Sequence, residues 1–247
     1  MKAETPDSVV FDLARAPVRE LNQFLHGDLA GVKRVLVNNP DGAHSIAVGV
    51  NAPVAITIDG HAGYYAAGMN KHATVSIAGN AGPGVAENMM SGTVRVKGFA
   101  SVSAGASAHG GLLVIEGDAG LRCGISLKGG DIVVGGDVGA FSAFMAQAGR
   151  IVVCGDAAEN LGDSLYEAVL YVQGEVKSLG ADAQFEPMGA ADVAAVGELL
   201  AAGLGAAVLQ VSRRPAAPCR ASGTSRNPAR ASGARSARPD HCAGRSG

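Results

Sequence analysis

The sequence contains no tryptophan, and its 247 residues include four tyrosines and six phenylalanines. This scarcity argues against carbohydrate-active enzymes, which stack sugar rings on aromatic side chains. The chain is nevertheless 47% hydrophobic and 17% charged, which is too apolar for a disordered protein. It has 36 glycines, about twice the usual share, but no Gly-X-Y period that would indicate collagen. We therefore expect a folded core that needs few aromatic residues.

Signals for secretion, membrane insertion and disulfide bonding are also missing. The N-terminal MKAETPDSVVFDL carries acids and a proline where a signal peptide requires an apolar stretch. The longest apolar run, residues 199–209, has 11 residues, whereas a membrane span needs about 20. The four cysteines show no CxxC spacing and are too few for a secreted disulfide scaffold. These features predict a cytoplasmic protein without a membrane partner.

Charge is distributed unevenly along the chain. Residues 1–212 hold 12 Lys+Arg against 21 Asp+Glu, whereas residues 213–247 hold eight arginines against one acid, Asp240. This tail lacks Ile, Leu, Val, Phe and Tyr, so it is predicted to be disordered. It has no interleaved aromatics, which argues against nucleic-acid binding. Its Arg, Ala, Pro, Gly and Ser bias is typical of a GC-rich gene read out of frame.

The most informative feature is an internal repeat of 19 residues without insertion or deletion. Each repeat begins with Ile, Val or Leu, has Ile or Val at position 3, and has glycine at position 5. The seven copies start with ITIDGHAG (from Ile56), VSIAGNAG (Val75), VRVKGFAS (Val94), LVIEGDAG (Leu113), IVVGGDVG (Ile132), IVVCGDAA (Ile151) and LYVQGEVK (Leu170). Positions below are counted from these first residues.

The repeat predicts an all-β fold, a single-stranded right-handed parallel β-helix of about seven coils. Apolar positions 1 and 3 alternate with position 2, as in a short strand with one buried face. A fixed glycine at position 5 and a small residue at position 12 indicate tight bends or close backbone approaches. Seven coils stacked ~4.8 Å apart would form a rod of roughly 30 Å. The LxxLxLxxN signature of leucine-rich repeats is absent.

The ends of such a rod require caps, because open strand edges are exposed there. We assign residues 1–55 to an N-terminal cap containing a helix at about Pro17 to His26, and residues 56–188 to the β-helix. Residues 189–212 are predicted to be a helical C-terminal cap, with a helix from Asp192 to Ala202, and residues 213–247 the disordered tail.

The repeats resemble the GXGXG β-helix domain that ends the large subunit of glutamate synthase. The sequences that carry the resemblance are GHAGYYAAGMNK (60–71), AENMMSGTVRVKG (86–98), GGLLVIEGDAGLRCGISLKGGDIVV (110–134) and GDSLYEAVLYVQG (162–174). With RELNQFLH (19–26) and GAHSIAVG (42–49) in front, the chain is most similar to the β-helix subunit of N-methylglutamate synthase (methylamine:glutamate N-methyltransferase). The β-helix subunit of formylmethanofuran dehydrogenase is a more distant resemblance.

The resemblance implies a non-catalytic scaffold subunit in a complex acting on glutamate and methylamine. Its implied partners are an amidotransferase-like subunit and a synthase subunit that holds FMN and an iron-sulfur cluster. It implies no catalytic, cofactor-binding or metal-binding residue in this chain. The Arg-rich tail departs from the folded C-terminal segment that the family leads us to expect.

Position 6, just after the glycine, offers the best candidate for chemistry. Its residues are His61, Asn80, Phe99, Asp118, Asp137, Asp156 and Glu175. Stacked acids would face solvent or hold a cation such as Ca²⁺, and a free-standing hydrolase or lyase would use two of them as acid and base. An aspartate after a glycine corner more often bonds its own backbone in a turn, and we favour that interpretation.

Position 2 lies on the outward side of the first strand and becomes apolar in the last four repeats. The residues are Val114, Val133, Val152 and Tyr171. A row of apolar side chains on the outside requires a cover. Two alternatives remain open at this point: a docking face for a partner subunit, or a surface covered by the chain's own C-terminal helix.

Overall fold

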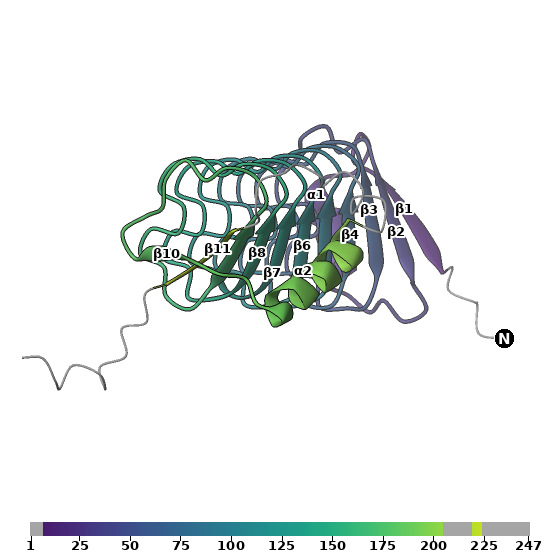
Figure 1. Ribbon diagram of the computed structural model, residues 1–247. Helices are drawn as coiled ribbons and strands as arrows, with labels where there is room; N and C mark the ends of the chain where they lie inside the picture. The colour runs from purple at the N-terminus through teal and green to yellow at the C-terminus, as the bar shows by residue number, and fades with distance from the viewer. Residues whose placement is uncertain (1–6, 205–218, 224–247) are drawn as a thin grey trace, which may run out of the picture.

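The computed structural model describes residues 7–204 and 219–223. In them the chain winds into a solenoid with a long sheet along one side (Figure 1). Two helices are present in this part, α1 (Val18–Leu25) and α2 (Ala190–Gly203). The strands are β1 (Ser8–Asp12), β2 (Arg34–Asn38), β3 (Ala55–Asp59), β4 (Thr74–Ile77), β5 (Thr93–Val96), β6 (Leu112–Ile115), β7 (Lys128–Val134), β8 (Ala148–Val153), β9 (Val169–Val172), β10 (Ala183–Glu186) and β11 (Cys219–Gly223).

Strands β1 to β9 are parallel and follow one another in sequence order, which confirms the predicted solenoid. From β3 onward, equivalent residues pair at the 19-residue interval, as Ala55 with Thr74 and Thr74 with Thr93. A second stack of parallel bridges joins position 7 of successive coils, starting with Ala62 and Ala81. Each coil is therefore hydrogen-bonded to the next along two sides.

The stack begins before residue 56, inside the segment predicted to be a cap. Arg34 pairs with Ala55, so the β2 coil has 21 residues, and Ser8 pairs with Arg34, so the β1 coil has 26. These lengths depart from the 19-residue period, which is why the repeat does not reveal them. The longest coil includes α1, at the predicted position.

The interior of the solenoid is one continuous apolar cluster. It is built by repeat positions 1, 3, 7 and 11, whose side chains are buried in successive coils, for example Ile56, Ile58, Ala62 and Ala66. Position 7 is Ala or Val in every repeat, which narrows the interior of the coil, so Ile, Val and Leu fill it without large rings. Helix α1 closes the N-terminal end by burying Leu21 and Leu25 against this cluster.

Helix α2 lies across the outer face of the sheet, in contact with β6 and β7 (Figure 1). The predicted helix is confirmed, but it covers the side of the rod rather than its end. Residues 205–212 of the predicted C-terminal cap lie outside the described residues.

Strand β11 covers the edge of β9. It pairs antiparallel with β9 and β10, so the sheet ends in the order β9, β11, β10. Because β11 lies within residues 213–247, the predicted disorder of this tail is corrected for residues 219–223; the remainder lies outside the described residues. The prediction considered only apolar side chains, whereas a strand edge recruits a partner through its main chain.

Candidate functional site

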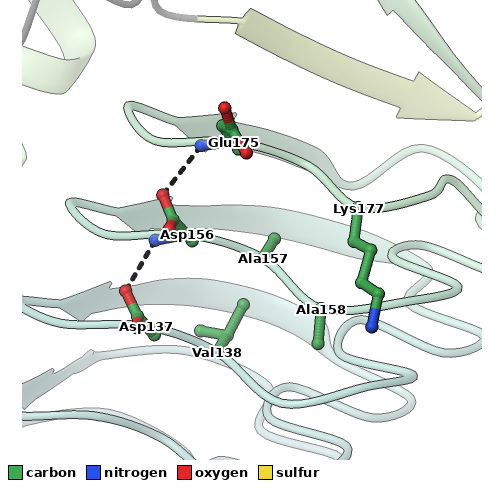
Figure 2. A pocket seen from close by; sticks show the side chains of 7 residues that line it. All are labelled: Asp137, Val138, Asp156, Ala157, Ala158, Glu175 and Lys177. Carbon is green, nitrogen blue, oxygen red and sulfur yellow. Dashed lines mark hydrogen bonds between the residues drawn. The ribbon is translucent and has the colours of Figure 1, made fainter.

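The position-6 side chains form a ladder of hydrogen bonds between coils. Asp118 Oδ1 accepts from the Asp137 backbone N–H at 2.9 Å. Asp137 Oδ1 accepts from the Asp156 backbone N–H at 2.7 Å, and Asp156 Oδ1 from that of Glu175 at 2.8 Å (Figure 2). In earlier coils His61 Nδ1 and Asn80 Oδ1 accept in the same way. The expected bond of each aspartate to its own turn backbone is wrong, because the amide that each side chain bonds belongs to the next coil.

A shallow cavity of about 280 Å³ runs beside this ladder (Figure 2). Its lining includes Asp137, Asp156, Glu175 and Lys177. Lys177 Nζ is paired with Glu159 Oε1 at 2.5 Å. Asp137 and Asp156 are both exposed, and the carboxylate of each accepts a main-chain N–H. Glycoside hydrolysis requires one carboxyl group as the acid and a second in a different environment as the base or nucleophile. The surroundings of these two carboxylates are alike, so they do not assign the two roles. Within the described residues, no group of three or more His, Cys, Asp or Glu side chains could hold a metal ion.

The ladder predicts different effects for two substitutions at Asp137. Asp137→Asn keeps the oxygen acceptor and removes a charge from a stack of acids, so we expect the free energy of unfolding to stay the same or rise slightly. Asp137→Ala removes the acceptor and should lower it by about 1 kcal/mol. Urea unfolding of both variants tests this. Equal losses for Asn and Ala would show that the charge itself matters, as a cation site requires.

Neither cysteine in the described repeats is suited to nucleophilic chemistry. Cys123 is fully buried, and burial raises the pKa of its thiol to about 12. Burial also raises the pKa of the half-buried Cys154. Because the thiolate is the reactive form, both thiols are unreactive at neutral pH.

The apolar stripe at position 2 lies beneath α2. Val114, Val133, Val152 and Tyr171 are at most 6% exposed. The last three form an outer cluster with Leu199 and Leu200 of α2. Of the two alternatives for this stripe, the structure shows the chain's own helix. Docking of a partner on these four side chains would require α2 to leave.

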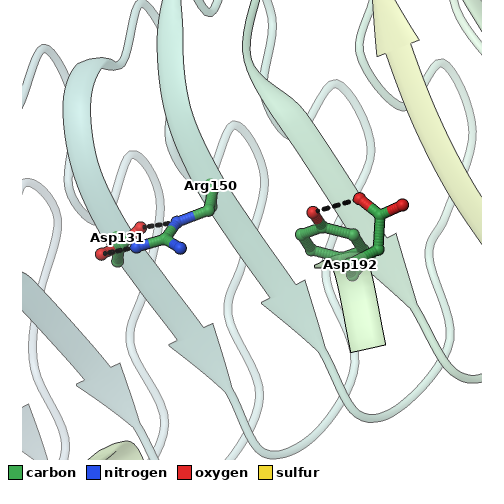
Figure 3. A network of polar contacts seen from close by, with 4 residues as sticks. Asp131, Arg150 and Asp192 are labelled. Atoms are coloured by element: carbon green, nitrogen blue, oxygen red, sulfur yellow. Dashed lines mark hydrogen bonds and ion pairs between the residues drawn. The ribbon is translucent and has the colours of Figure 1, made fainter. Parts of the chain in front are cut away.

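Polar contacts fix the start of α2 over the last coils. Tyr171 Oη donates to Asp192 Oδ1 at 2.9 Å (Figure 3). Asp192 Oδ2 accepts from the Gly189 backbone N–H at 2.8 Å. On the same sheet face Arg150 makes two hydrogen bonds to Asp131, at 2.7 and 2.8 Å, which raise the pKa of the guanidinium (Figure 3). The aromatic ring of Tyr171 thus contributes apolar contact, and its hydroxyl orients the helix.

Another apolar surface lies at position 9, where the side chains are exposed or partly exposed. We call it the ridge, and its residues are Tyr64, Pro83, Val102, Leu121 and Ala140. Main-chain bonds stack these positions, as in Gly84 N–H to the Val102 carbonyl at 3.0 Å and Ser103 N–H to the Leu121 carbonyl at 2.9 Å. Tyr64 and Leu121 are 51% and 52% exposed. The ridge was not among the predicted surfaces, although five apolar residues in consecutive repeats were a usable signal.

Comparison with known proteins gives one partial relationship. The chain is 54% identical over 58 residues to Protein GlxC of Rhizobium meliloti (strain 1021). The match covers 23% of this chain and 25% of GlxC, so it spans about a quarter of the length of the relative. No family model matches the chain. In the described part of the chain, neither helix has the length and apolar character needed to cross a bilayer.

Proposed function

We propose that this chain is a non-catalytic structural subunit with a glutamate-synthase-related role. The observation that carries the proposal is the ridge, a row of five apolar residues of which Tyr64, Val102 and Leu121 are exposed. Contiguous apolar residues on a protein surface are typical of protein-protein contacts. The stacked acids, by contrast, are engaged in joining the coils, which supports a structural use for the groups best suited to catalysis.

The finer proposal is that the complex is N-methylglutamate synthase, acting in the cytoplasm on glutamate and methylamine. The sequences that resemble the GXGXG domain fall in the regular coils between β3 and β9, which supports a shared architecture. The 58-residue match to GlxC supports a relationship to a bacterial protein over a limited region. FMN and the iron-sulfur cluster would be bound by the synthase subunit, which would contact the ridge.

The proposal is tested by co-expressing this chain with the flavin-containing synthase subunit and the amidotransferase-like subunit. Size-exclusion chromatography with absorbance at protein and flavin wavelengths should show one flavin-bearing particle that contains all three. Elution of this chain separately from a folded synthase subunit would contradict the proposal. Turnover of glutamate and methylamine by the chain alone would contradict its non-catalytic character.

Substitution of Leu121 tests the ridge as the contact surface. Leu121→Glu places a charge in the middle of the apolar row, and we expect it to weaken the complex about tenfold or more. Val193→Glu is the matched control, because Val193 is 61% exposed on α2, away from the ridge. Both variants should keep the wild-type melting temperature. Equal affinities for the two variants would place the contact elsewhere.

A further inference from the structure

Strand β1 is the terminal strand of the sheet at its N-terminal end. Within the described residues it has one strand neighbour, β2, whereas the edge of β9 at the other end is covered by β11. Strand β1 contains no proline or lysine, the residues that commonly protect an edge from pairing. Its central residue Val10 is 60% exposed, the second-highest value among the exposed large apolar residues of the described chain.

The hydrogen bonds flanking β1 show which main-chain groups face outward. The Asp7 carbonyl accepts from Arg34 N–H at 3.0 Å, and Leu13 N–H donates to the Asn38 carbonyl at 3.0 Å. In a parallel ladder alternate residues bond to the same neighbour, so the odd-numbered residues of β1 face β2. The N–H and C=O groups of Ser8 and Val10, and the N–H of Asp12, therefore point away from the sheet.

This edge is complementary to itself. An antiparallel pair of β1 strands centred on Val10 gives two hydrogen bonds between the Val10 residues. It gives two more in total, one from each Asp12 N–H to the Ser8 carbonyl of the other copy. The Asp12 carbonyl already accepts from Arg15 and Ala16 N–H groups at 3.0 Å, so it is not needed.

Side chains at the edge also permit this pairing. The two Val10 side chains would meet at the two-fold axis and bury each other's apolar surface. Each Asp12 would lie opposite Ser8 rather than opposite a second acid, and its carboxylate is already held by Asn39 Nδ2 at 2.7 Å and by Arg15 at 3.3 Å. Asp7 is paired with Arg34 at 3.0 Å. No like charges of the described residues face each other across the two-fold axis in this register.

We propose that the occupant of this edge is a second copy of the same chain. The two solenoids join through β1 around a two-fold axis and form one continuous sheet, with an α2 on each half. An interface of this kind is isologous and closes at the dimer, so it does not lead to fibres. In a complex it would supply two equivalent sets of docking surfaces.

The test is the oligomeric state of the full chain by size exclusion with light scattering across a dilution series. Wild type should be a dimer. Val10→Pro removes the N–H at the two-fold axis, which β2 does not use, so we expect the fold to persist and the dimer dissociation constant to rise about tenfold or more. Val10→Thr is the control, because it keeps the N–H and a β-branched side chain, and it should remain dimeric.

A monomeric wild type, or a Val10→Pro variant that dimerises as well as Val10→Thr, would overturn the proposal. Co-elution of Val10→Pro with the synthase subunit separates this result from the proposed function, because the ridge does not involve β1. If wild type is a monomer alone and pairs through β1 only when the synthase subunit is added, the occupant is a strand of that partner and the proposal is likewise overturned.

Discussion

Val133→Glu should release α2 from the outer face of the sheet while the solenoid stays folded. Val133 is fully buried between the sheet and the helix, and a Cβ added to Gly203 would lie 3.3 Å from three of its side-chain atoms. The basic side chain on this face, Arg150, is already held by both carboxylate oxygens of Asp131 at 2.7 and 2.8 Å, so a second carboxylate buried at position 133 would have to compete for it. Such a charge costs several kcal/mol, of which separation of α2 relieves the greater part.

The solenoid is expected to survive because the neighbours of Val133 in sequence face the other way. Ile132 and Val134 belong to the interior cluster, which is separate from the outer cluster that includes α2. We expect the free energy that holds α2 to fall by about 3 kcal/mol or more, with rapid proteolysis inside residues 190–203. Far-UV circular dichroism should retain the β signal.

Val193→Glu on the same helix is the control for this experiment. Its side chain is 61% exposed, so the change should alter stability by less than about 0.5 kcal/mol and leave α2 protected. Equal protection of α2 in Val133→Glu and Val193→Glu would show that Val133 does not hold the helix on the sheet.

The regular part of the fold could be predicted because its sequence and its structure share one period. Each coil repeats the strand pairing of the previous one, so the burial of Ile56 and Ile58 predicts the burial of the equivalent residues in the six other repeats. The first two coils escaped prediction because their lengths differ from 19 residues. The position of α2 could not be predicted, because the apolar stripe indicates only that something covers it. A partner subunit and the chain's own C-terminal helix met that requirement equally well.

The glycines and small residues were identified correctly, but their physical roles differ from one position to another. At position 12 the backbone is left-handed, and Ala67 and Ala143 adopt φ of 55° and 59° there. At position 5 most glycines have no positive φ, and what matters is instead the distance to the coil below. A left-handed backbone and a close approach between coils both select glycine or another small residue. The sequence alone therefore could not show which of the two applies at each position.

Gly155→Val should destabilise the solenoid itself, because position 5 has no room for a side chain. A Cβ at Gly155 would lie 2.7 Å from the carbonyl carbon and oxygen of Gly136 in the preceding coil. It would also lie 2.1 Å from Asp137 Oδ1, but that side chain can rotate whereas the backbone cannot. The coils must separate locally, which strains the hydrogen bond from Gly155 N–H to the Gly136 carbonyl, now 3.0 Å.

We expect a loss of about 3 kcal/mol, since a rigid stack transmits a local displacement to the coils on both sides. For a chain of this size the melting temperature should fall by about 6–12 °C. Gly197→Ala is the matched control: a Cβ at Gly197 meets nothing within 4 Å, so the better helix former should raise stability by about 1 kcal/mol. An unchanged melting temperature for Gly155→Val would show that coil spacing is not limited at position 5, and that its glycines serve the turn rather than the stacking.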